Sequence, residues 1–461
     1  MIQNRDAYAT TPARETALAC VEAGIRAAMP DRAVERALSL SGDTLHVADA
    51  TYDLSSFDRV LVVGGGKASA RLTGALVDLL GDRIDDGVVL VPESDAGAAG
   101  PVTLGAGGHP TPTEEGVAAT RRALDLVRDA DERTLVLAPV TGGGSALFAA
   151  PAPGVSLAAV QSVTRDLLDA GAAIDEVNAV RTAVSAVKGG RLAAEAAPAT
   201  VVGLLLSDVV GDDPAVVASG PTVAAESTPG EARWVLNEYG VAADEIREFL
   251  SDAEPGPVPD DLAFDRVRTV VLADATTALE AARETAVERG YDSRIVSPDV
   301  TGESSDRGRE GSALALDVLA CGDGPAVLLS GGETTVTVRG NGRGGPNCEY
   351  ALAGAIHLAE VEDDTAAGDQ VPGERVAVAA VDTDGLDGSS DAAGALVDGT
   401  TVDDPDAAHD ALADNDALGY LEERGALRTG PTGTNVNDLR AWVVEGDADG
   451  GTGDGSRTGT R

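Results

Sequence analysis

Lysine is almost absent from this chain, which makes its two lysines informative. Of the 34 basic residues, only Lys67 and Lys188 are lysine, and both stand beside glycine, in GGGKAS and VKGGRL. Glycine lets the backbone adopt positive φ and approach a ligand closely, and a strand leading through glycine into a helix can hold an anion on free N–H groups. Lys67 is therefore predicted to contact a phosphoryl group or a carboxylate. The alternative is a tight turn whose lysine only faces solvent.

A second glycine loop, TGGGSAL (residues 141–147), follows the apolar segment RTLVLAPV. In open α/β sheets, ligands bind outside the carboxyl ends of the strands, where such loops gather. Further glycine-rich turns, SGGET and GNGRGG, occur in the second half of the chain. Several such turns favour a ligand with more than one negative charge. Ser145 is expected to begin a helix, and its alternative role is a local N-cap.

The segment NAVRTAVSAVKGGRLA spaces Asn178, Arg181, Ser185 and Lys188 by three or four residues. This spacing predicts that the four side chains share one helical face, which would be cationic in an acidic protein. The alternative is an ordinary solvated face, since a helix end also favours lysine through the helix dipole.

Carboxylates follow the apolar segment TVVGLLL, in SDVVGDDPAVVASGPT. Asp208 stands at the predicted strand end, and Asp212 and Asp213 lie in the turn behind it. Mg²⁺ prefers oxygen ligands and keeps waters and phosphate oxygens in its shell, so Asp208 and Asp212 are candidate magnesium ligands. The alternative, a capping aspartate, suits Asp213 better than Asp208.

The second half of the chain carries two more polar segments. DTDGLDGSSDAAG contains Asp382, Asp384, Asp387 and Asp391, for which substrate-hydroxyl binding or general-base work is possible. TGPTGTNVNDL has more polar side chains than a turn needs. His109, in the glycine-rich segment GGHPTPTEEG, is a candidate for lining the cleft in which the ligand binds. No G-x-S-x-G pattern occurs, which argues against a hydrolase of that type.

The composition indicates the habitat of the protein and limits its partners. The net charge is −43 and aromatic residues make up 3%, as in cytoplasmic proteins of salt-loving microbes. At molar salt the Debye length falls to about 3 Å, so repulsion among surface carboxylates is screened. The negative field argues against nucleic acid or an anionic membrane as a partner. With no signal-peptide pattern and no long apolar run, we expect a cytoplasmic protein.

Apolar runs of four to seven residues alternate with helical patterns, which predicts parallel strands covered by helices. Residues 11–40, with a proline at position 30, predict two successive helices. We expect VRTVVLAD to belong to the second domain. We also expect PAVLLS and TTVTVRG to form an antiparallel hairpin, since GGE between them is too short for a crossover helix.

The predicted fold class is α/β with two domains. An N-terminal Rossmann-like domain with a mainly parallel sheet is expected over residues 10–245, followed by a linker over 246–265 that contains the proline-rich and acidic SDAEPGPVPDDL. A C-terminal α/β domain with a mixed sheet is expected over 266–445. The last segment, 446–461, is expected to be a disordered acidic tail.

Eight motifs in order resemble the glycerate 2-kinase family, whose C-terminal part is the MOFRL domain. They are GGGKAS, GHPTPTEEG, TGGGSAL, VRTAVSAVKGGRLA, SDVVGDDPAVVASGPT, SGGETTVTVRGNGRGG, DTDGLDGSSDAAGA and TGTNVNDL. The resemblance runs from about residue 10 to about residue 440. It implies ATP- and Mg²⁺-dependent phosphorylation of D-glycerate at its second hydroxyl, in a cleft between the domains.

The resemblance also implies a role for each matching residue. The catalytic residues would be Lys67, Asp208 and Arg343, and Asp208 and Asp212 would hold the metal. Phosphate and nucleotide would bind at Gly64, Gly65, Gly66, Ser69, Gly142, Gly143, Gly144, Ser145, Lys188, Ser219 and Gly220. Glycerate would bind at His109, Asn178, Arg181, Glu333, Asn347, Asp384, Asp387, Thr434 and Asn435.

The chain departs from the family at one position. The family has an arginine in a GGRNQE-like motif, whereas this chain reads GGPNCE, with Pro346 in that place. We hypothesise that Arg343 or Arg181 supplies the missing charge.

Two other functions compete with the kinase. Relatives of the family are also named hydroxypyruvate reductases, and Gly64, Gly66 and Glu93 partly imitate a dinucleotide site. However, Ser69 replaces the third glycine of that motif, and a reductase would leave the second glycine loop and Asp208 without a task. A non-catalytic sensor would bind ATP without turnover. The sequence does not decide whether the protein forms a homo-oligomer.

Overall fold

The computed structural model describes residues 1–461 apart from 225–227, 253–263, 323, 366–374 and 447–461. The chain divides into two compact units. Unit 1 contains Met1–Arg26, Ala275–Thr432 and the chain from Asn437 onward; unit 2 contains Ala27–Asp274 and Gly433–Val436. Most of the predicted linker, and the predicted tail after residue 446, lie outside the described residues.

Unit 2 is built on a seven-stranded sheet of order β10-β9-β8-β4-β5-β7-β6. Neighbouring strands are parallel except β6, which is antiparallel to β7. The strands are β4 (Arg59–Gly65), β5 (Asp86–Pro92), β6 (Gly97–Ala99), β7 (Val102–Gly107), β8 (Thr134–Thr141), β9 (Thr200–Leu206) and β10 (Val267–Ala273). Every residue of β8 is buried, as its continuous apolar run predicts.

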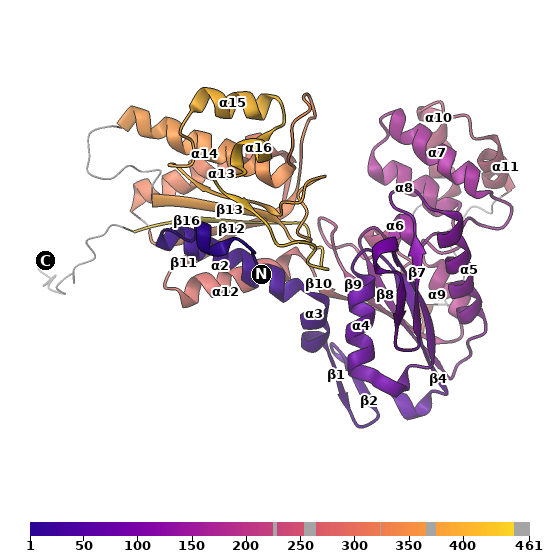
Figure 1. The fold of residues 1–461 in the computed structure, drawn as a ribbon. Coiled ribbons are helices and arrows are strands. Elements are labelled where there is room, and N and C mark those ends of the chain that lie inside the picture. Colours follow the sequence, from indigo (N-terminus) through magenta and orange to yellow (C-terminus); the bar gives the residue numbers. More distant parts are fainter. Residues whose placement is uncertain (225–227, 253–263, 323, 366–374, 447–461) are drawn as a thin grey trace, which may run out of the picture. The chain divides into compact units, whose positions relative to one another are not determined.

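Helices cover both faces of this sheet (Figure 1). α3 (Pro30–Ala37) and α4 (Ser69–Leu80) lie on one face, and α5 (Glu114–Arg128) and α9 (Arg191–Ala196) lie on the other. A helical cluster with its own apolar core contains α7 (Leu157–Asp169), α8 (Ile174–Ala183), α10 (Pro229–Glu238) and α11 (Asp244–Asp252). The short α6 (Gly144–Leu147) follows β8, and β1 (Leu38–Ser41), β2 (Thr44–Val47) and β3 (Ala50–Asp53) form a small antiparallel sheet.

Unit 1 has a mixed six-stranded sheet of order β11-β12-β16-β13-β14-β15. Only β11 and β12 are parallel, and the other pairs are antiparallel. The strands are β11 (Asp292–Glu303), β12 (Ala326–Thr335), β13 (Val376–Asp382), β14 (Gly394–Asp398), β15 (Ala426–Leu427) and β16 (Asp438–Val444). The two-domain α/β fold class with a mixed second sheet is thus confirmed.

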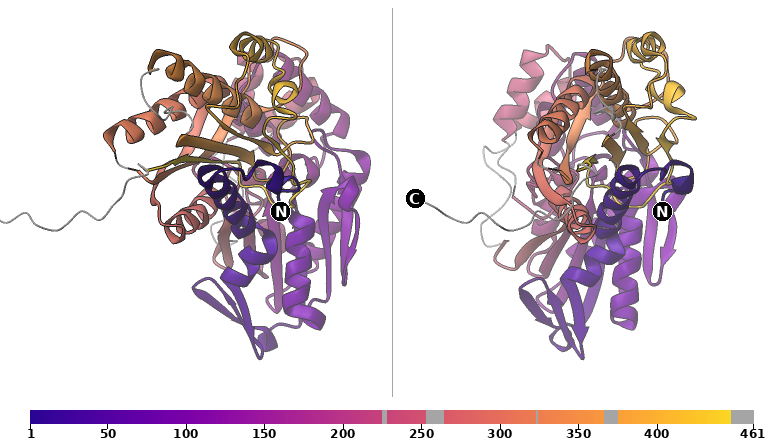
Figure 2. Two further views of the ribbon diagram at one scale, coloured as in Figure 1. Left: turned by 60° about the vertical axis from the view of Figure 1, so that its left-hand side comes forward. Right: turned by 90° about the vertical axis from the view of Figure 1, so that its left-hand side faces the viewer.

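The sheet of unit 1 lies between two layers of helices (Figures 1 and 2). One layer contains α13 (Ser304–Cys321), α14 (Pro346–Thr365) and α15 (Pro405–Ala413), with α16 (Ala417–Leu421) beside them. The other contains α2 (Pro12–Ala28) and α12 (Ala275–Glu288), and α1 (Arg5–Tyr8) precedes α2. The two helices expected within residues 11–40 are therefore present as α2 and α3. No helix of the described residues is long and apolar enough to cross a membrane.

Two predictions on strands need correction. The segment VRTVVLAD was expected in the second domain, but β10 pairs in parallel with β9 and extends the sheet of unit 2. The expected hairpin does not form, because β12 runs through Gly331 and Gly332 as one strand. These glycines pair with Leu439 and Asp438 of β16, a strand more than a hundred residues further along the chain.

Candidate active site

The two glycine loops of unit 2 lie side by side because the strands before them, β4 and β8, are parallel neighbours. The N–H of Lys67 donates to the carbonyl oxygen of Gly142 at 2.8 Å. The N–H of Ala68 donates to the Thr141 hydroxyl at 3.1 Å. A Cβ on Gly64 would lie 2.0 Å from the carbonyl oxygen of Pro139, so the close approach of the strands requires glycine there.

The Lys67 side chain is exposed and lies against the second loop. A Cβ on Gly143 would lie 2.9 Å from Cγ of Lys67 and 3.4 Å from Cδ2 of His109. Gly143 has φ of 74°, in the left-handed region that favours glycine. The structure thus brings Lys67, the second glycine loop and His109 together. That this group binds an anion stays a prediction.

His109 lies beside positive charge, which disfavours its protonated form. Burial lowers the pKa of His109 below its ordinary 6.5, and the charges of Lys67 and Arg181 lower it further. A neutral ring can accept a hydrogen bond or a proton from a bound hydroxyl at neutral pH.

We expect the pKa of His109 to move back towards 6.5 when Lys67→Met removes one of these charges. A pH titration of the ring C–H signals by NMR measures this shift, and the other three histidines of the chain serve as internal references. An unchanged His109 titration would contradict the proximity of the two side chains.

Asp208 follows β9 and packs directly on the second glycine loop. A Cβ on Gly142 would lie 1.7 Å from Oδ2 of Asp208, so only glycine leaves room for this carboxylate. Asp212 lies in the turn beyond, with φ of 53°. The described residues contain no cluster of three metal-ligating side chains. Mg²⁺ in kinase sites commonly binds one or two carboxylates plus substrate phosphates, and Asp208 beside two anion loops fits this pattern.

The SGPT turn, residues 219–222, lies beside the second glycine loop. The hydroxyls of Ser145 and Ser219 are hydrogen-bonded to each other. The N–H groups of Gly189 and Gly190 donate to the carbonyl oxygens of Ser219 and Gly220, at 2.9 and 2.7 Å. The turn that contains Lys188, Gly189 and Gly190, here called the lysine–glycine turn, is thereby hydrogen-bonded to the SGPT turn. The SGPT turn is bonded to the second glycine loop through Ser145.

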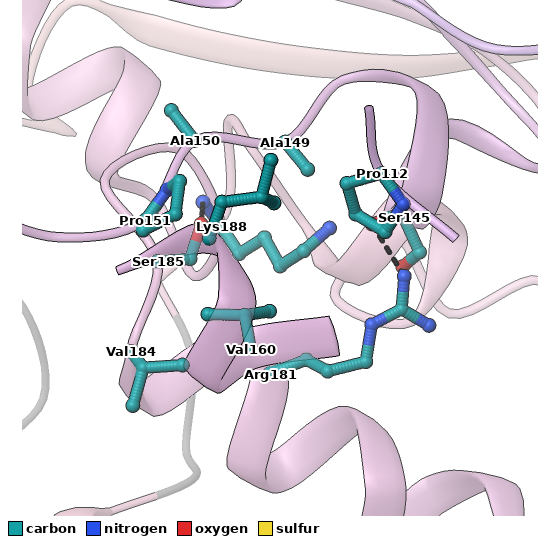
Figure 3. Close-up of a pocket in the computed structure, with 11 residues that line it drawn as sticks. Pro112, Ser145, Ala149, Ala150, Pro151, Val160, Arg181, Val184, Ser185 and Lys188 are labelled. Carbon is teal, nitrogen blue, oxygen red and sulfur yellow. Dashed lines mark hydrogen bonds between the residues drawn. The ribbon is translucent and has the colours of Figure 1, made fainter. Parts of the chain in front are cut away.

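The predicted cationic helix face needs correction. α8 ends at Ala183, so Ser185 and Lys188 lie in the turn behind it. There the Ser185 hydroxyl accepts hydrogen bonds from the N–H groups of Val187 and Lys188, at 3.1 and 3.2 Å. This turn nevertheless brings Arg181, Ser185 and Lys188 to one small cavity, which Ser145 also lines (Figure 3). Asn178 instead lines a different cavity of about 420 Å³, with Asp213 and Ser219 on its wall.

Several predicted residues of unit 1 have structural partners. Asp387 is fully buried, and its carboxylate accepts from the N–H groups of Gly345, Asn347 and Cys348 at 2.8 to 3.0 Å. It therefore caps α14, although burial raises its pKa. Asn347 is also fully buried and donates to Asp438 at 2.6 Å.

Other predicted residues lie closer to the surface. Arg343 is exposed and forms an ion pair with Glu422 at 3.4 Å. Glu333 is exposed near the end of β12, and Asp384 is half-buried in the turn after β13. Asn435 is half-buried and Thr434 is buried, and both belong to unit 2.

Asp382, one of the aspartates of DTDGLDGSSDAAG, belongs to an acidic group in unit 1 whose other member, Asp438, sequence reasoning missed. Asp382 and Asp438 are register partners at one end of β13 and β16. Burial raises the pKa of Asp382 well above its ordinary value, and the negative charges of Asp384 and Asp438 raise it further. Asp438 pairs with Arg440, which is fully buried. Two opposite charges two residues apart in an apolar strand, Asp438 and Arg440, were the signal that could have revealed Asp438.

Comparison with known proteins places these features in a family. A family model described as a domain of unknown function (DUF4147) matches residues 16–251, and the MOFRL family matches residues 326–438. A curated relative, the D-glycerate 2-kinase of Thermotoga maritima, is 37% identical over 440 residues, which cover 92% of this chain and 97% of the relative. The chain belongs to the glycerate 2-kinase family.

A solved structure agrees with this membership. The crystal structure of the glycerate kinase of Thermotoga maritima matches with a TM-score of 0.81 at 35% identity, covering 93% of this chain and 99% of that one. A relative from Agrobacterium vitis, 38% identical over 402 residues, is named only provisionally as a hydroxypyruvate reductase; the match covers 84% of this chain and 99% of the relative.

The glycerate 2-kinase family models map onto the two units. The first model falls mainly on unit 2, with the two glycine loops and Asp208, and the MOFRL model falls on unit 1 except for Gly433–Val436, which belong to unit 2. Pro346, which stands in place of the family arginine, is the first residue of α14. Proline suits that position, because the first N–H groups of a helix lack intrahelical partners.

Proposed function

We propose that this chain transfers the γ-phosphoryl group of ATP to the 2-hydroxyl of D-glycerate, giving 2-phosphoglycerate and ADP. The observation that carries this proposal is the arrangement in unit 2, where two glycine loops, Lys67 and His109 meet beside the carboxylate of Asp208. Phosphoryl transfer requires mainly positioning and charge stabilisation, which such a group of donors and cations supplies.

In this proposal each group has one task. The backbone N–H groups of the second glycine loop and the ammonium of Lys67 hold the phosphates and stabilise the charge that develops during transfer, whereas the first loop, whose N–H groups at Lys67 and Ala68 donate within the protein, positions Lys67. Asp208, with Asp212 behind it, would hold Mg²⁺, which neutralises phosphate charge when bound. The substrate oxygen attacks the γ-phosphorus, the bond to ADP breaks, and the hydroxyl proton leaves to a nearby base, for which neutral His109 is suited. Arg343 or Arg181 would replace the family arginine absent at Pro346.

The acidic composition supports a further part of the proposal. A net charge of −43 with arginine in place of lysine suits a protein that works in the cytoplasm at high salt, where surface carboxylates are screened and well hydrated.

The test compares two parallel incubations of the same protein. The purified protein is given MgATP and D-glycerate in multimolar KCl, and phosphorus NMR identifies the product; a parallel sample receives NADH or NADPH with hydroxypyruvate. We expect a 2-phosphoglycerate signal and no oxidation of the nicotinamide. Oxidation without phosphorylation would establish the reductase instead, and ATP binding without turnover would establish a sensor.

A further inference from the structure

The small cavity of unit 2 that lies between α7 and the lysine–glycine turn carries only positive charge among its described lining residues. Two cations, Arg181 and Lys188, contribute to its wall, and none of the described residues that line it is a carboxylate. The remaining lining is apolar apart from Ser145 and Ser185, and comprises Pro112, Ala149, Ala150, Pro151, Leu157, Val160 and Val184. On an apolar wall these cations attract an anion more strongly than they would in water, because the effective dielectric constant is lower there.

Lys188 has no partner in this cavity. It is 2% exposed, and its Nζ makes no hydrogen bond with any described residue. Figure 3 shows its side chain extended, with the terminal nitrogen directed towards the part of the cavity near Ser145 and Arg181. Burial lowers the pKa of Lys188 well below its ordinary value, and the charge of Arg181 lowers it further. An anion bound beside Lys188 would offset the cost of burying its charge and favour the ammonium form again, which makes this unpartnered nitrogen a candidate anion ligand.

The size of the cavity limits what this anion can be. Its volume is about 20 Å³, room for one or two atoms the size of a water molecule. One oxygen of a carboxylate fits this space while the rest of the group stays at its mouth, whereas a triphosphate as a whole does not fit. Ser145 and Leu157 on its wall are partly exposed, so a ligand can enter from the surface with the rest of its body outside.

The position of Arg181 links this cavity to the phosphate side of the site. Its guanidinium donates to the carbonyl oxygen of Ser145 at 2.7 Å, on the helix that follows the second glycine loop. Its charge also acts on His109, which lies next to Lys67. The cavity at Lys188 is therefore connected through Arg181 to the second glycine loop and to His109.

We propose that Lys188 and Arg181 bind the carboxylate of glycerate in this cavity, which places the hydroxyls of the substrate towards Lys67 and the second glycine loop. This inference rests on the proposed function and reassigns Lys188, which the sequence placed among the phosphate-binding residues. Each of the two lysines then serves one end of the reaction, Lys188 the carboxylate and Lys67 the phosphoryl group.

Calorimetric binding without turnover tests the assignment. We expect Lys188→Met to weaken the binding of D-glycerate about 10- to 100-fold, the worth of a charge-assisted hydrogen bond. The variant should change the binding of the uncharged amide, D-glyceramide, less than about threefold, and likewise that of MgATP. Arg165→Met is the matched control, because it removes an exposed charge from α7, the helix that also carries Val160. It should leave D-glycerate binding unchanged.

Each other outcome is decisive. Weakened MgATP binding with intact D-glycerate binding would make Lys188 a phosphate ligand and overturn the inference, as would unchanged binding of both. If Lys188→Met fails to fold, the wild type decides, because equal affinity for D-glycerate and D-glyceramide would exclude a carboxylate site. The phosphorus NMR assay stays independent. A wild type that discriminates against the amide but makes no 2-phosphoglycerate would refute the kinase and leave the carboxylate site standing.

Discussion

Lys67→Met should lower kcat for glycerate phosphorylation by at least about 10³-fold. Methionine keeps the apolar length of the side chain, which packs against Gly143, and removes only the ammonium group. A cation that stabilises the transferring phosphoryl group contributes about 10³ to 10⁵ to the rate in related chemistry. The phosphorus NMR assay, run as a time course, gives kcat, and calorimetry shows whether the variant still binds D-glycerate.

Two further variants define this effect. Lys67→Arg keeps the charge but changes its geometry, so it should retain part of the lost activity. Arg83, which follows the other end of α4 and bonds Asp43 at 3.2 Å, is the matched control for loss of one positive charge in the same unit. Arg83→Met should stay within twofold of the wild type. If Lys67→Met also does, the phosphoryl role of Lys67 is refuted and the GGGKAS segment is only a tight turn.

Much of this site was predictable from local sequence, because strands and glycine loops are set by neighbouring residues. The carboxyl ends of parallel strands meet at one edge of a sheet, so the loops after β4, β8 and β9 had to come together once those strands were identified. This explains why Lys67 and Asp208 reach the same second glycine loop, although 141 positions separate them in the printed sequence.

The errors arose where a distant segment decides the local structure. The GGE segment can form a turn or continue a strand, and β16 decides for the strand by pairing with Gly331 and Gly332. α8 ends at Ala183 since the turn beyond it is held by Ser185 and by hydrogen bonds from Gly189 and Gly190 to the SGPT turn. Periodicity along the chain carries no information on such contacts.

Arg440→Met should destabilise unit 1 by about 3 to 5 kcal/mol, the usual cost of removing one partner of a buried ion pair. Arg440 is fully buried and donates to Asp438, to the Thr334 hydroxyl at 2.9 Å and to the carbonyl oxygen of Gly331 at 3.3 Å. Its guanidinium also lies 4.6 Å from the centre of the Tyr350 ring. Without it, the Asp438 carboxylate stays buried with only neutral donors.

The two tryptophans of the chain allow this loss to be assigned to one unit. Trp442 is 3% exposed in β16, whereas Trp234 in unit 2 is 54% exposed. Unfolding of unit 1 should therefore change the emission of Trp442, while Trp234 contributes little change. Guanidinium titrations followed by fluorescence should give a lower midpoint for Arg440→Met. Arg294→Met, which breaks the exposed pair with Asp292 in the same sheet, should cost less than about 1 kcal/mol.

A double variant separates the pair from the packing around it. In Arg440→Met with Asp438→Asn, the new amide oxygen can still accept from the Thr334 N–H, which lies 3.2 Å from Asp438 in the wild type, and no charge is left without a partner. The new amide N–H faces Asn347, which donates to Asp438 in the wild type; the Asn347 amide must turn so that its Oδ1, which has no hydrogen-bond partner among the described residues, accepts instead. Replacing a whole buried ion pair by neutral groups is often close to neutral, so the second change should restore at least half of the lost stability. If the double variant is less stable than Arg440→Met alone, the loss comes from packing of the arginine stem and its contact with Tyr350. The uncompensated Asp438 charge would then be excluded as its cause.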